Sequence, residues 1–308
     1  MSATRREFLE RSSLALAGAA MTRRTMRAQA PAPAPPATAF RDLRRGVGCF
    51  TGQGGTIGYI ITPDNTVVVD SQYPATAKIC LDGLKSRAAH PIDFLINTHH
   101  HEDHTAGNPV MRPAVGRIVA QRGEPALQRK AADQAGTLTA QVFPDTVFTT
   151  DWKMVLDQET VSAHFYGPGH TGADIVVLFE NANVVHMGDL AWNRFHPFVD
   201  RPAGASIANW QKALDRIAGQ HTADAIYIFG HGKPEAGITG GRSDLLNFRD
   251  YFTAVIDYVQ RGVEAGHSKE DIVKLERLRG FEDYVAPSKT INLAQVLGAA
   301  YDELTETR

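Results

Sequence analysis

Short apolar runs separated by turn residues occupy much of the first three quarters of the chain. Residues 66–69 (Thr-Val-Val-Val) and 94–96 (Phe-Leu-Ile) are rich in β-branched or aromatic side chains and have the length of buried strands. Glycines flank Gln53 on both sides, which is typical of a hairpin tip. Further strand-like runs lie at residues 147–165, 175–179, 184–186 and 225–229. This pattern predicts a domain built on packed β-sheets.

Helical periodicity appears between these runs and dominates from about residue 243. Ala77, Cys80, Leu81 and Leu84 fall at i, i+3, i+4 and i+7, which predicts one buried helix face and makes Cys80 a core residue. Further helices are expected at residues 124–135, 207–219 after the N-cap Ser206, 248–263, 268–275 and 291–304. The alternation predicts a layered α/β domain over residues 41–240, followed by a helical C-terminal extension over residues 241–308.

The first forty residues have a different character. Arg5 and Arg6 precede a modestly apolar stretch at residues 12–21, and Ala28-Gln29-Ala30 has the small residues of a cleavage site. This order resembles a twin-arginine (Tat) export signal at residues 1–30, which implies recognition by the Tat export machinery and a periplasmic or other extracytoplasmic protein. A basic amphipathic start or a retained anchor is the alternative. Residues 31–40 are rich in proline and alanine and are expected to form an extended linker.

Composition narrows the possible function classes. The 308 residues include 32 basic and 34 acidic side chains, of which residues 1–30 hold six and two. The rest of the chain therefore has 26 basic and 32 acidic side chains, which argues against a nucleic-acid-binding protein. No apolar run reaches the roughly 18 residues of a membrane span, so no stable membrane insertion is expected after processing. Two cysteines are too few for a disulfide scaffold, whereas many of the twelve histidines are clustered.

A dense group of histidines and carboxylates follows the strand predicted at residues 94–96. The loop at the C-terminal end of that strand reads Thr98-His99-His100-His101-Glu102-Asp103-His104. Side chains two residues apart in such a loop can turn toward one point, so His99 and His101 can share a metal ion while Asp103 and His104 reach a neighbouring position. Imidazole and carboxylate ligands suit zinc, iron or manganese. Polar residues also stand where four other predicted strands end: Asp70, His170, Asp189 and His231.

The order H-x-H-x-D-H, then His, then Asp, then His in Gly-His-Gly resembles the metallo-β-lactamase superfamily over residues 46–235. The resemblance implies an αβ/βα sandwich with metals in a groove at one edge of two packed sheets. It also implies the ligand set: His99, His101 and His170 for a first metal, and Asp103, His104 and His231 for a second. Asp189 would bridge the two metals, and Asp70 would support the ligand loop without being a ligand.

The chemistry follows from the same resemblance. Two Zn²⁺ ions per chain would share a hydroxide that cleaves an ester, lactone, thioester or amide of a small-molecule substrate, and Asp103 would also act catalytically by orienting that hydroxide. An aspartate at position 189 looks more like the glyoxalase II and lactonase branches, since the β-lactam hydrolases typically have cysteine or serine there. No glutathione-binding motif is found, and an exported protein would not meet a cytosolic glutathione thioester. The prediction is therefore an exported zinc hydrolase of unassigned substrate.

Three alternatives remain open from the sequence. A mononuclear Fe²⁺ enzyme similar to the persulfide dioxygenases would use His101 or His99 together with His170 and Asp189. A β-lactam hydrolase is disfavoured by Asp189 without being excluded. A non-catalytic metal-binding module is disfavoured by the complete ligand set.

Several polar residues near the motifs have competing interpretations. His100 lies between two predicted ligands and is expected to point away from them, while His186 falls inside a predicted strand. Trp192, Arg194 and His196 closely follow the predicted bridging aspartate and are candidates for the wall of a substrate groove. Packing of this loop against the C-terminal helices is the alternative.

Overall fold

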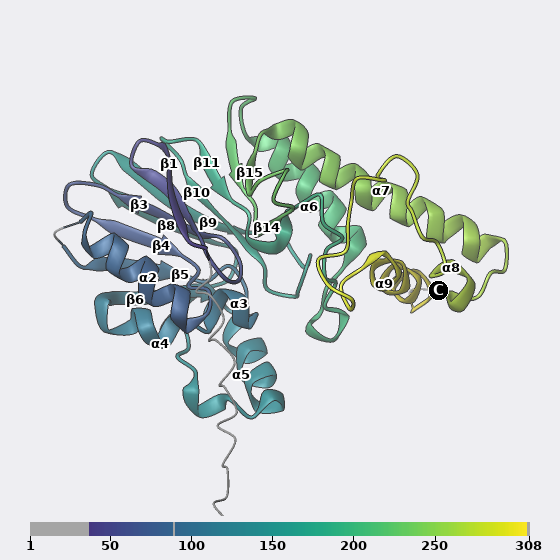
Figure 1. Cartoon of the computed structure of the whole chain (residues 1–308), viewed down its shortest axis with the longest axis horizontal. Helices are drawn as coiled ribbons and strands as arrows, with labels where there is room; N and C mark the ends of the chain where they lie inside the picture. The colour runs from purple at the N-terminus through teal and green to yellow at the C-terminus, as the bar shows by residue number, and fades with distance from the viewer. Residues whose placement is uncertain (1–36, 89, 307–308) are drawn as a thin grey trace, which may run out of the picture. The chain divides into compact units, whose positions relative to one another are not determined.

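The computed structural model describes residues 37–88 and 90–306 of the chain (Figure 1). The predicted export signal at residues 1–30 lies outside the described residues, and so does most of the predicted linker. The first strand already begins at Ala39, and the ring of Phe40 packs 4.8 Å from that of Phe50 between centroids. The first strand thus begins two residues before the predicted domain boundary at residue 41, and the ring contact of Phe40 attaches it to the sheet.

Two mixed β-sheets form the centre of the part of the chain that the structure describes (Figure 1). The first sheet has the order β1-β2-β3-β4-β5-β6-β7 and the second has the order β15-β13-β11-β10-β9-β8, while β12 pairs with β14 separately. The strands of the first sheet are β1 (Ala39–Arg44), β2 (Val47–Thr51), β3 (Ile57–Ile61), β4 (Thr66–Val69), β5 (Ile92–Ile96), β6 (Val115–Gln121) and β7 (Thr146–Phe148). The others are β8 (Asp151–Leu156), β9 (Glu159–Phe165), β10 (Ile175–Phe179), β11 (Val184–His186), β12 (Trp192–Asn193), β13 (Ile226–Ile228), β14 (His231–Gly232) and β15 (Thr239–Gly240).

Helices cover the outer faces of both sheets (Figure 1). Beside the first sheet lie α2 (Pro74–Lys85), α4 (Asn108–Met111) and α5 (Glu124–Ala135), and beside the second lie α6 (Ile207–Gln220), α7 (Arg242–Glu264) and α9 (Leu293–Glu306). The short elements are α3 (Glu102–Thr105), α8 (Lys269–Ile272) and the 3₁₀ turns η1 (Arg112–Ala114), η2 (Leu138–Ala140), η3 (Gly188–Leu190) and η4 (Arg201–Ala203). The layers confirm the predicted α/β sandwich with C-terminal helices.

Strand periodicity explains how these layers are held together. Val67 and Val69 of β4 face the second sheet and join the core between the two sheets, whereas Val68 faces α2. In the same way, Val177 of β10 faces the first sheet while Val176 faces the helices of the other layer. Successive side chains of a strand point to opposite faces, so a run of apolar residues is the pattern of a strand buried on both sides.

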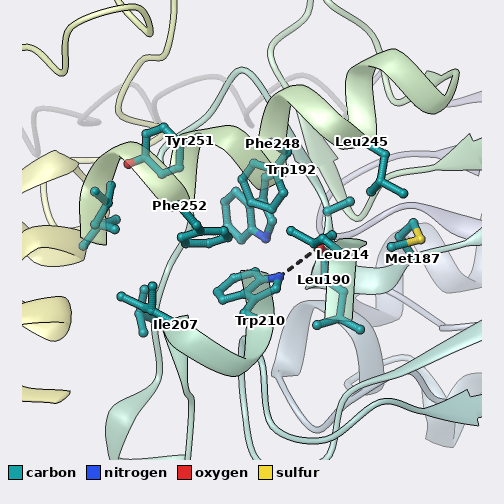
Figure 2. Packing of buried hydrophobic residues seen from close by; sticks show 14 of the residues in the cluster. Met187, Leu190, Trp192, Ile207, Trp210, Leu214, Leu245, Phe248, Tyr251 and Phe252 are labelled. Atoms are coloured by element: carbon teal, nitrogen blue, oxygen red, sulfur yellow. Dashed lines mark hydrogen bonds between the residues drawn. The ribbon is translucent and has the colours of Figure 1, made fainter. Parts of the chain in front are cut away.

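The largest apolar cluster joins the second sheet to the C-terminal helices. Figure 2 shows the fully buried Trp210 of α6 beneath Phe248 and Phe252 of α7, and the centroid of the Phe252 ring lies 4.6 Å from that of Trp210. The indole N–H of Trp210 donates to the carbonyl oxygen of Leu190 at 3.0 Å. Leu190 follows Asp189 directly, so this core lies immediately behind the predicted site.

The predicted helices are present, with differences that local capping explains. The helix predicted at residues 124–135 has these bounds, and Ser206 caps α6 by accepting from the backbone N–H of Asn209. The last helix starts at Leu293, two residues later than predicted, because the side chain of Asn292 caps it by accepting from the N–H of Gln295 at 3.0 Å. The capped segment after Ser268 is only one turn long, α8, and not the predicted eight residues.

The helices of residues 37–88 and 90–306 were compared with the length and hydropathy of a membrane span. None of the helices there is both long enough and apolar enough to cross a bilayer.

Candidate metal centre

The seven predicted ligands converge at one end of the two sheets, although they come from four separate loops. His99, His101, Asp103 and His104 follow β5, His170 follows β9, Asp189 follows β11 and His231 follows β13. Strands β4 and β5 run parallel in the first sheet, and β11 and β13 run parallel in the second. Because parallel strands end at the same edge of a sheet, their following loops meet there.

Three histidines and one carboxylate form a first cluster, composed of His99, His101, His170 and Asp189. The Nδ1 atom of His101 lies 3.2 Å from Nε2 of His99 and 2.9 Å from Nε2 of His170. Asp189 Oδ2 lies 3.4 Å from Nε2 of His170. These four donor atoms all lie within 4.8 Å of one another, so this group could hold a metal ion.

A second cluster of three residues, Asp103, His104 and His231, adjoins the first and could also hold a metal ion. Asp103 Oδ2 lies 3.1 Å from Nε2 of His231 and 3.7 Å from Nε2 of His104. The Oδ1 atom of Asp189 lies 3.0 Å from Nε2 of His104 and 3.4 Å from Nε2 of His231. The two oxygens of Asp189 therefore face the two clusters separately.

A buried chain of hydrogen bonds fixes which nitrogen of His99 and His104 faces the clusters. The hydroxyl of Thr98 donates to Asp70 Oδ2 at 2.8 Å, so it accepts from Nδ1 of His99 at 3.0 Å. Nδ1 of His104 donates to the same Asp70 oxygen at 2.7 Å. In both rings the remaining Nε2 faces the clusters, and this is the supporting position predicted for Asp70.

The loop of His170 is held in a similar way. Nδ1 of His170 donates to the carbonyl oxygen of Phe198 at 2.7 Å, which leaves the Nε2 lone pair facing His101. Asp174 accepts from the backbone N–H of Gly169 at 3.2 Å and from that of Thr171 at 2.7 Å, so it braces the turn that carries His170.

The residues fit metal ions better than they fit one another. Lone pairs of His99, His101 and His170 converge without a shared proton donor, and such an arrangement is satisfied by a cation at their centre. In addition, Nε2 of His104 and Oδ1 of Asp189 are buried 3.0 Å apart, and neither atom has another hydrogen-bond partner among the described residues. Burial opposes protonation of His104, but the carboxylates of Asp189, Asp103 and Asp70 outweigh it and raise its pKa well above the usual range, so this position requires a positive charge, which a proton or a metal ion can supply.

The pKa values of the histidines differ between the two clusters. Burial lowers the pKa of His170 to about 4 and that of His99 well below its usual range, so both rings are neutral and ready to bind a metal. Burial opposes protonation of His231 too, but the carboxylates of Asp189 and Asp103 outweigh it and raise its pKa to about 9. A metal ion at the second cluster would take the place of protons that the carboxylates otherwise attract.

Comparison with known proteins identifies the family. The profile of the metallo-beta-lactamase superfamily matches residues 51–231, which is more than half of the chain. The chain belongs to this superfamily. A probable metallo-hydrolase of Methanocaldococcus jannaschii is 24% identical over 183 residues, which cover 57% of this chain and 86% of that protein. The protein is thus a metal-dependent hydrolase of the metallo-beta-lactamase superfamily.

Solved structures show the same fold. A metallo-beta-lactamase from Pontibacter korlensis superposes with a TM-score of 0.58 at 19% identity, covering 70% of this chain and 99% of its own. The inverting sec-alkylsulfatase Pisa1 from Pseudomonas sp. gives a TM-score of 0.67 at 15% identity, covering 86% of this chain and 50% of its own. A match over 86% of 308 residues cannot end at residue 240, so the likeness to the sulfatase fold continues into the helical extension.

Glycines of this superfamily member let the backbone approach the ligands closely. A Cβ atom on Gly230, which precedes His231, would collide with Oδ1 of Asp189, and one on Gly55 would collide with the ring of His104. The Gly-rich tip between β2 and β3 therefore lies against the second cluster. The Gly-His-Gly motif needs its first glycine for the same reason.

One side of the centre is accessible. The side chains of His101, Asp103 and His231 are 19%, 24% and 20% exposed, whereas those of His99, His104, His170 and Asp189 are buried. Among the seven residues of the two clusters, these three form the edge that is open to solvent in the described part of the chain.

The three candidate groove residues lie in different places. Trp192 is buried and its ring lies 4.4 Å from that of His231, so it backs a ligand. Arg194 binds Asp283 through Nε at 2.9 Å, and Nδ1 of His196 lies 2.9 Å from the hydroxyl of Tyr251 on α7. Neither Arg194 nor His196 joins the clusters; both pack against the C-terminal region, which is the alternative interpretation of this loop.

Other histidines near the motifs also have structural partners. Nε2 of His186 donates to the carbonyl oxygen of Thr56 at 2.9 Å, so this ring joins the two sheets. His100 belongs to neither of the two clusters, and its Nε2 lies 3.8 Å from Asp200.

Two residues that contact the ligands were not found from the sequence. The carbonyl of Phe198 binds His170, and Asp200 Oδ2 lies 2.9 Å from Nε2 of His101. Burial opposes ionisation of Asp200, but the hydrogen bond from His101 outweighs it and lowers the pKa of the carboxyl. The proline two residues after Asp200 marks a capped turn, but nothing local reveals a partner 99 residues away.

Proposed function

We propose that the chain is an exported dinuclear zinc hydrolase that cleaves an ester, lactone, thioester or amide bond of a small molecule. The observation that carries this proposal is the position of Asp189, whose two oxygens face two separate clusters of histidines and carboxylate. A carboxylate shared in this way suits a pair of neighbouring metal ions. Histidine and carboxylate ligands without sulfur are typical of hydrolytic zinc sites.

The buried and the exposed residues of the site would have different roles. When bound, the zinc ions would activate a shared water and polarise the bond under attack. His99, His104 and His170 are buried and would exclude bulk solvent from the inner side. Asp103 lies on the accessible edge; burial opposes its ionisation, but His104 and His231 outweigh it and lower its pKa to about 2. Its carboxylate would accept a hydrogen bond from the attacking water and hold it toward the substrate.

The mononuclear iron alternative would use only the first cluster. The second cluster offers three further donor groups that could hold another ion, and this supports two metals over one. An oxygenase activity would appear as oxygen uptake with glutathione persulfide by the iron-loaded protein, and hydrolysis would then be absent.

The direct test is hydrolysis by the zinc-loaded protein across a carboxylic ester, a lactone, a thioester and a β-lactam. A secondary alkyl sulfate belongs in the same panel, because the sulfatase fold resembles this one into the helical extension. We expect turnover of at least one class, loss of turnover after chelation, and recovery with zinc. A zinc-loaded protein that turns over none of these substrates would contradict the proposal.

Export is a separate part of the proposal, supported by the order of Arg5, Arg6 and Ala28-Gln29-Ala30. Replacement of both arginines by lysine should retain the protein in the cytoplasm, since the twin-arginine pair is what the export receptor reads. Cell fractionation of the full chain measures this, and unchanged export of the double variant would contradict it.

A further inference from the structure

Asp200 lies in the loop that joins the second sheet to α6, and each of its oxygens accepts one hydrogen bond, while Nε2 of His100 lies 3.8 Å from Oδ2. Oδ1 accepts from the backbone N–H of Ala203 at 3.1 Å and so caps the turn η4. Oδ2 accepts from Nε2 of His101 at 2.9 Å. One carboxylate therefore connects a structural turn to a ligand of the first cluster.

The contact determines which nitrogen of His101 can bind a metal. An ionised carboxylate can only accept, so the ring proton of His101 lies on Nε2 and the lone pair lies on Nδ1. Nδ1 is the atom that faces His99 and His170, at 3.2 and 2.9 Å. With the proton on Nδ1 instead, the ring would direct an N–H group at the two neighbouring lone pairs and could not be a ligand there.

His101 needs this support more than its neighbours do. The rings of His99 and His170 are buried and are held by Thr98 and by the carbonyl of Phe198, whereas the side chain of His101 is 19% exposed. No other hydrogen bond to Nε2 of His101 is found among the described residues.

The loop around Asp200 is itself anchored to the helical extension. Gln295 of α9 donates through Nε2 to the carbonyl oxygen of Val199 at 2.9 Å, and Arg201 binds Glu306 of α9 at 2.6 Å. On the other side, the backbone N–H of Asp200 donates to the carbonyl oxygen of His170 at 3.1 Å. The carboxylate is thus held at a fixed distance from His101 by elements on both sides.

We propose that Asp200 is a positioning residue of the metal centre, which holds His101 with Nδ1 directed at the metal of the first cluster. The inference rests on the proposed metal function of that cluster, and it makes the C-terminal helices part of the support of the centre. Removal of such a partner from a ligating histidine typically lowers metal affinity about 10- to 100-fold.

The test compares Asp200→Ser with the wild-type protein. Serine caps helical turns as well as aspartate does, so the turn η4 keeps its cap, but the hydroxyl is too short to reach His101. Asp200→Asn is a second variant of nearly unchanged shape, whose single acceptor oxygen cannot serve both Ala203 and His101. Asp215→Ser, at an exposed aspartate on α6, is the matched control for loss of a carboxylate.

Two readouts are independent of activity. Zinc titration of the metal-free protein against a competing chelator gives the affinity of each site, and ¹⁵N NMR of the histidine rings gives the tautomer of His101. We expect one zinc site of Asp200→Ser, the second cluster, to keep the affinity of the wild type. The other site, the first cluster, should bind zinc about 10- to 100-fold more weakly. We also expect His101 to lose its single Nε2–H tautomer, with an unchanged melting temperature of the metal-free protein.

Wild-type zinc affinity at both sites in Asp200→Ser and Asp200→Asn would overturn the inference, even if the wild type hydrolyses its substrate. A third zinc ion in the wild type that both variants lose would also overturn it, in favour of a metal site at His100, His101 and Asp200. Selective loss of one zinc ion in a protein that hydrolyses nothing would instead support the inference and contradict the proposed function.

Discussion

Asp189 is a buried carboxylate surrounded by histidines. It is buried, yet His231 and His104 hold the pKa of its carboxyl well below the usual range against the cost of burial. Both oxygens face histidine nitrogens, at distances from 3.0 Å for His104 to 3.9 Å for His99. A buried carboxylate of this kind requires bound cations or bound protons.

Replacement of Asp189 by asparagine should separate these possibilities. The amide keeps the shape but loses the charge and one acceptor oxygen, so it cannot be shared by two metals. We expect at most about one zinc ion per chain and a fall in hydrolysis of at least about 100-fold. Elemental analysis and initial rates check this, with Asp215→Asn as the control; two tightly bound zinc ions in Asp189→Asn would contradict a bridging role.

Asp70 offers a test of the supporting network. Its φ of 65° lies in the left-handed region, which asparagine also tolerates, so Asp70→Asn keeps the backbone. The amide cannot accept from His104 and from both groups of Thr98 as the carboxylate does. We expect zinc affinity about 10- to 100-fold lower and unfolding easier by about 1–3 kcal/mol, measured by chelator competition and urea unfolding. Unchanged zinc affinity would show that Asp70 supports the fold alone.

At this scale the motif predicts the clusters better than it predicts their support. His99, His101, Asp103 and His104 are readable from spacing because one loop carries them. Phe198 binds through a backbone carbonyl, which has no sequence signal, and Asp200 acts across 99 positions. Contacts that depend on where two distant loops meet cannot be derived from local pattern.

At the scale of elements, the start of α5 contains an unusual buried acid. Glu124 is the first residue of this helix, it is fully buried, and neither of its carboxylate oxygens has a hydrogen-bond partner among the described residues. Burial, with a smaller contribution from Asp70, raises the pKa of Glu124 to about 8. Between pH 4.5 and 8 the folded protein therefore keeps a proton that the unfolded chain has lost, and stability falls as the pH rises.

Glu124→Gln removes this dependence, because the amide is neutral at every pH. Relative to the wild type, the variant should gain free energy of unfolding by up to about 1.4 kcal/mol for each pH unit between pH 5 and pH 8. Urea unfolding of both zinc-free proteins at several pH values measures the difference. A difference that does not change with pH would show that Glu124 is ionised throughout.

Most helices and strands follow from periodicity, and the exceptions have local causes. Asn292 shortens the last helix by capping it, and the strands β12 and β14 consist only of the two residue pairs Trp192–His231 and Asn193–Gly232. A two-residue strand has no periodicity of its own. Sequence could therefore predict the type and approximate bounds of the main elements, but not the order of strands in the two sheets.

At the scale of the whole molecule, the C-terminal helices complete the core. Trp210 and Leu214 of α6 are fully buried in the same cluster as Phe248 and Phe252 of α7 (Figure 2). Removal of the C-terminal helices would expose the apolar face of this layer to water. The extension is therefore part of the fold and not an appendage that was added to a complete domain.

A chain that ends at residue 240 tests this arrangement. We expect the truncated protein to be insoluble or to lack a cooperative thermal transition, because a large apolar face loses its cover. The full chain purified in the same way is the control. A soluble, cooperatively folding fragment that keeps both zinc ions would contradict the structural role of the extension and its support of the Asp200 loop.

The central claim is that two adjacent clusters, bridged by Asp189, hold two zinc ions. Elemental analysis by mass spectrometry of the protein purified without added metal tests it most directly. The account predicts about two zinc ions per chain, reduced to at most about one in Asp189→Asn. A single iron ion per chain with little zinc would contradict the dinuclear zinc centre and would favour oxygen chemistry at the first cluster.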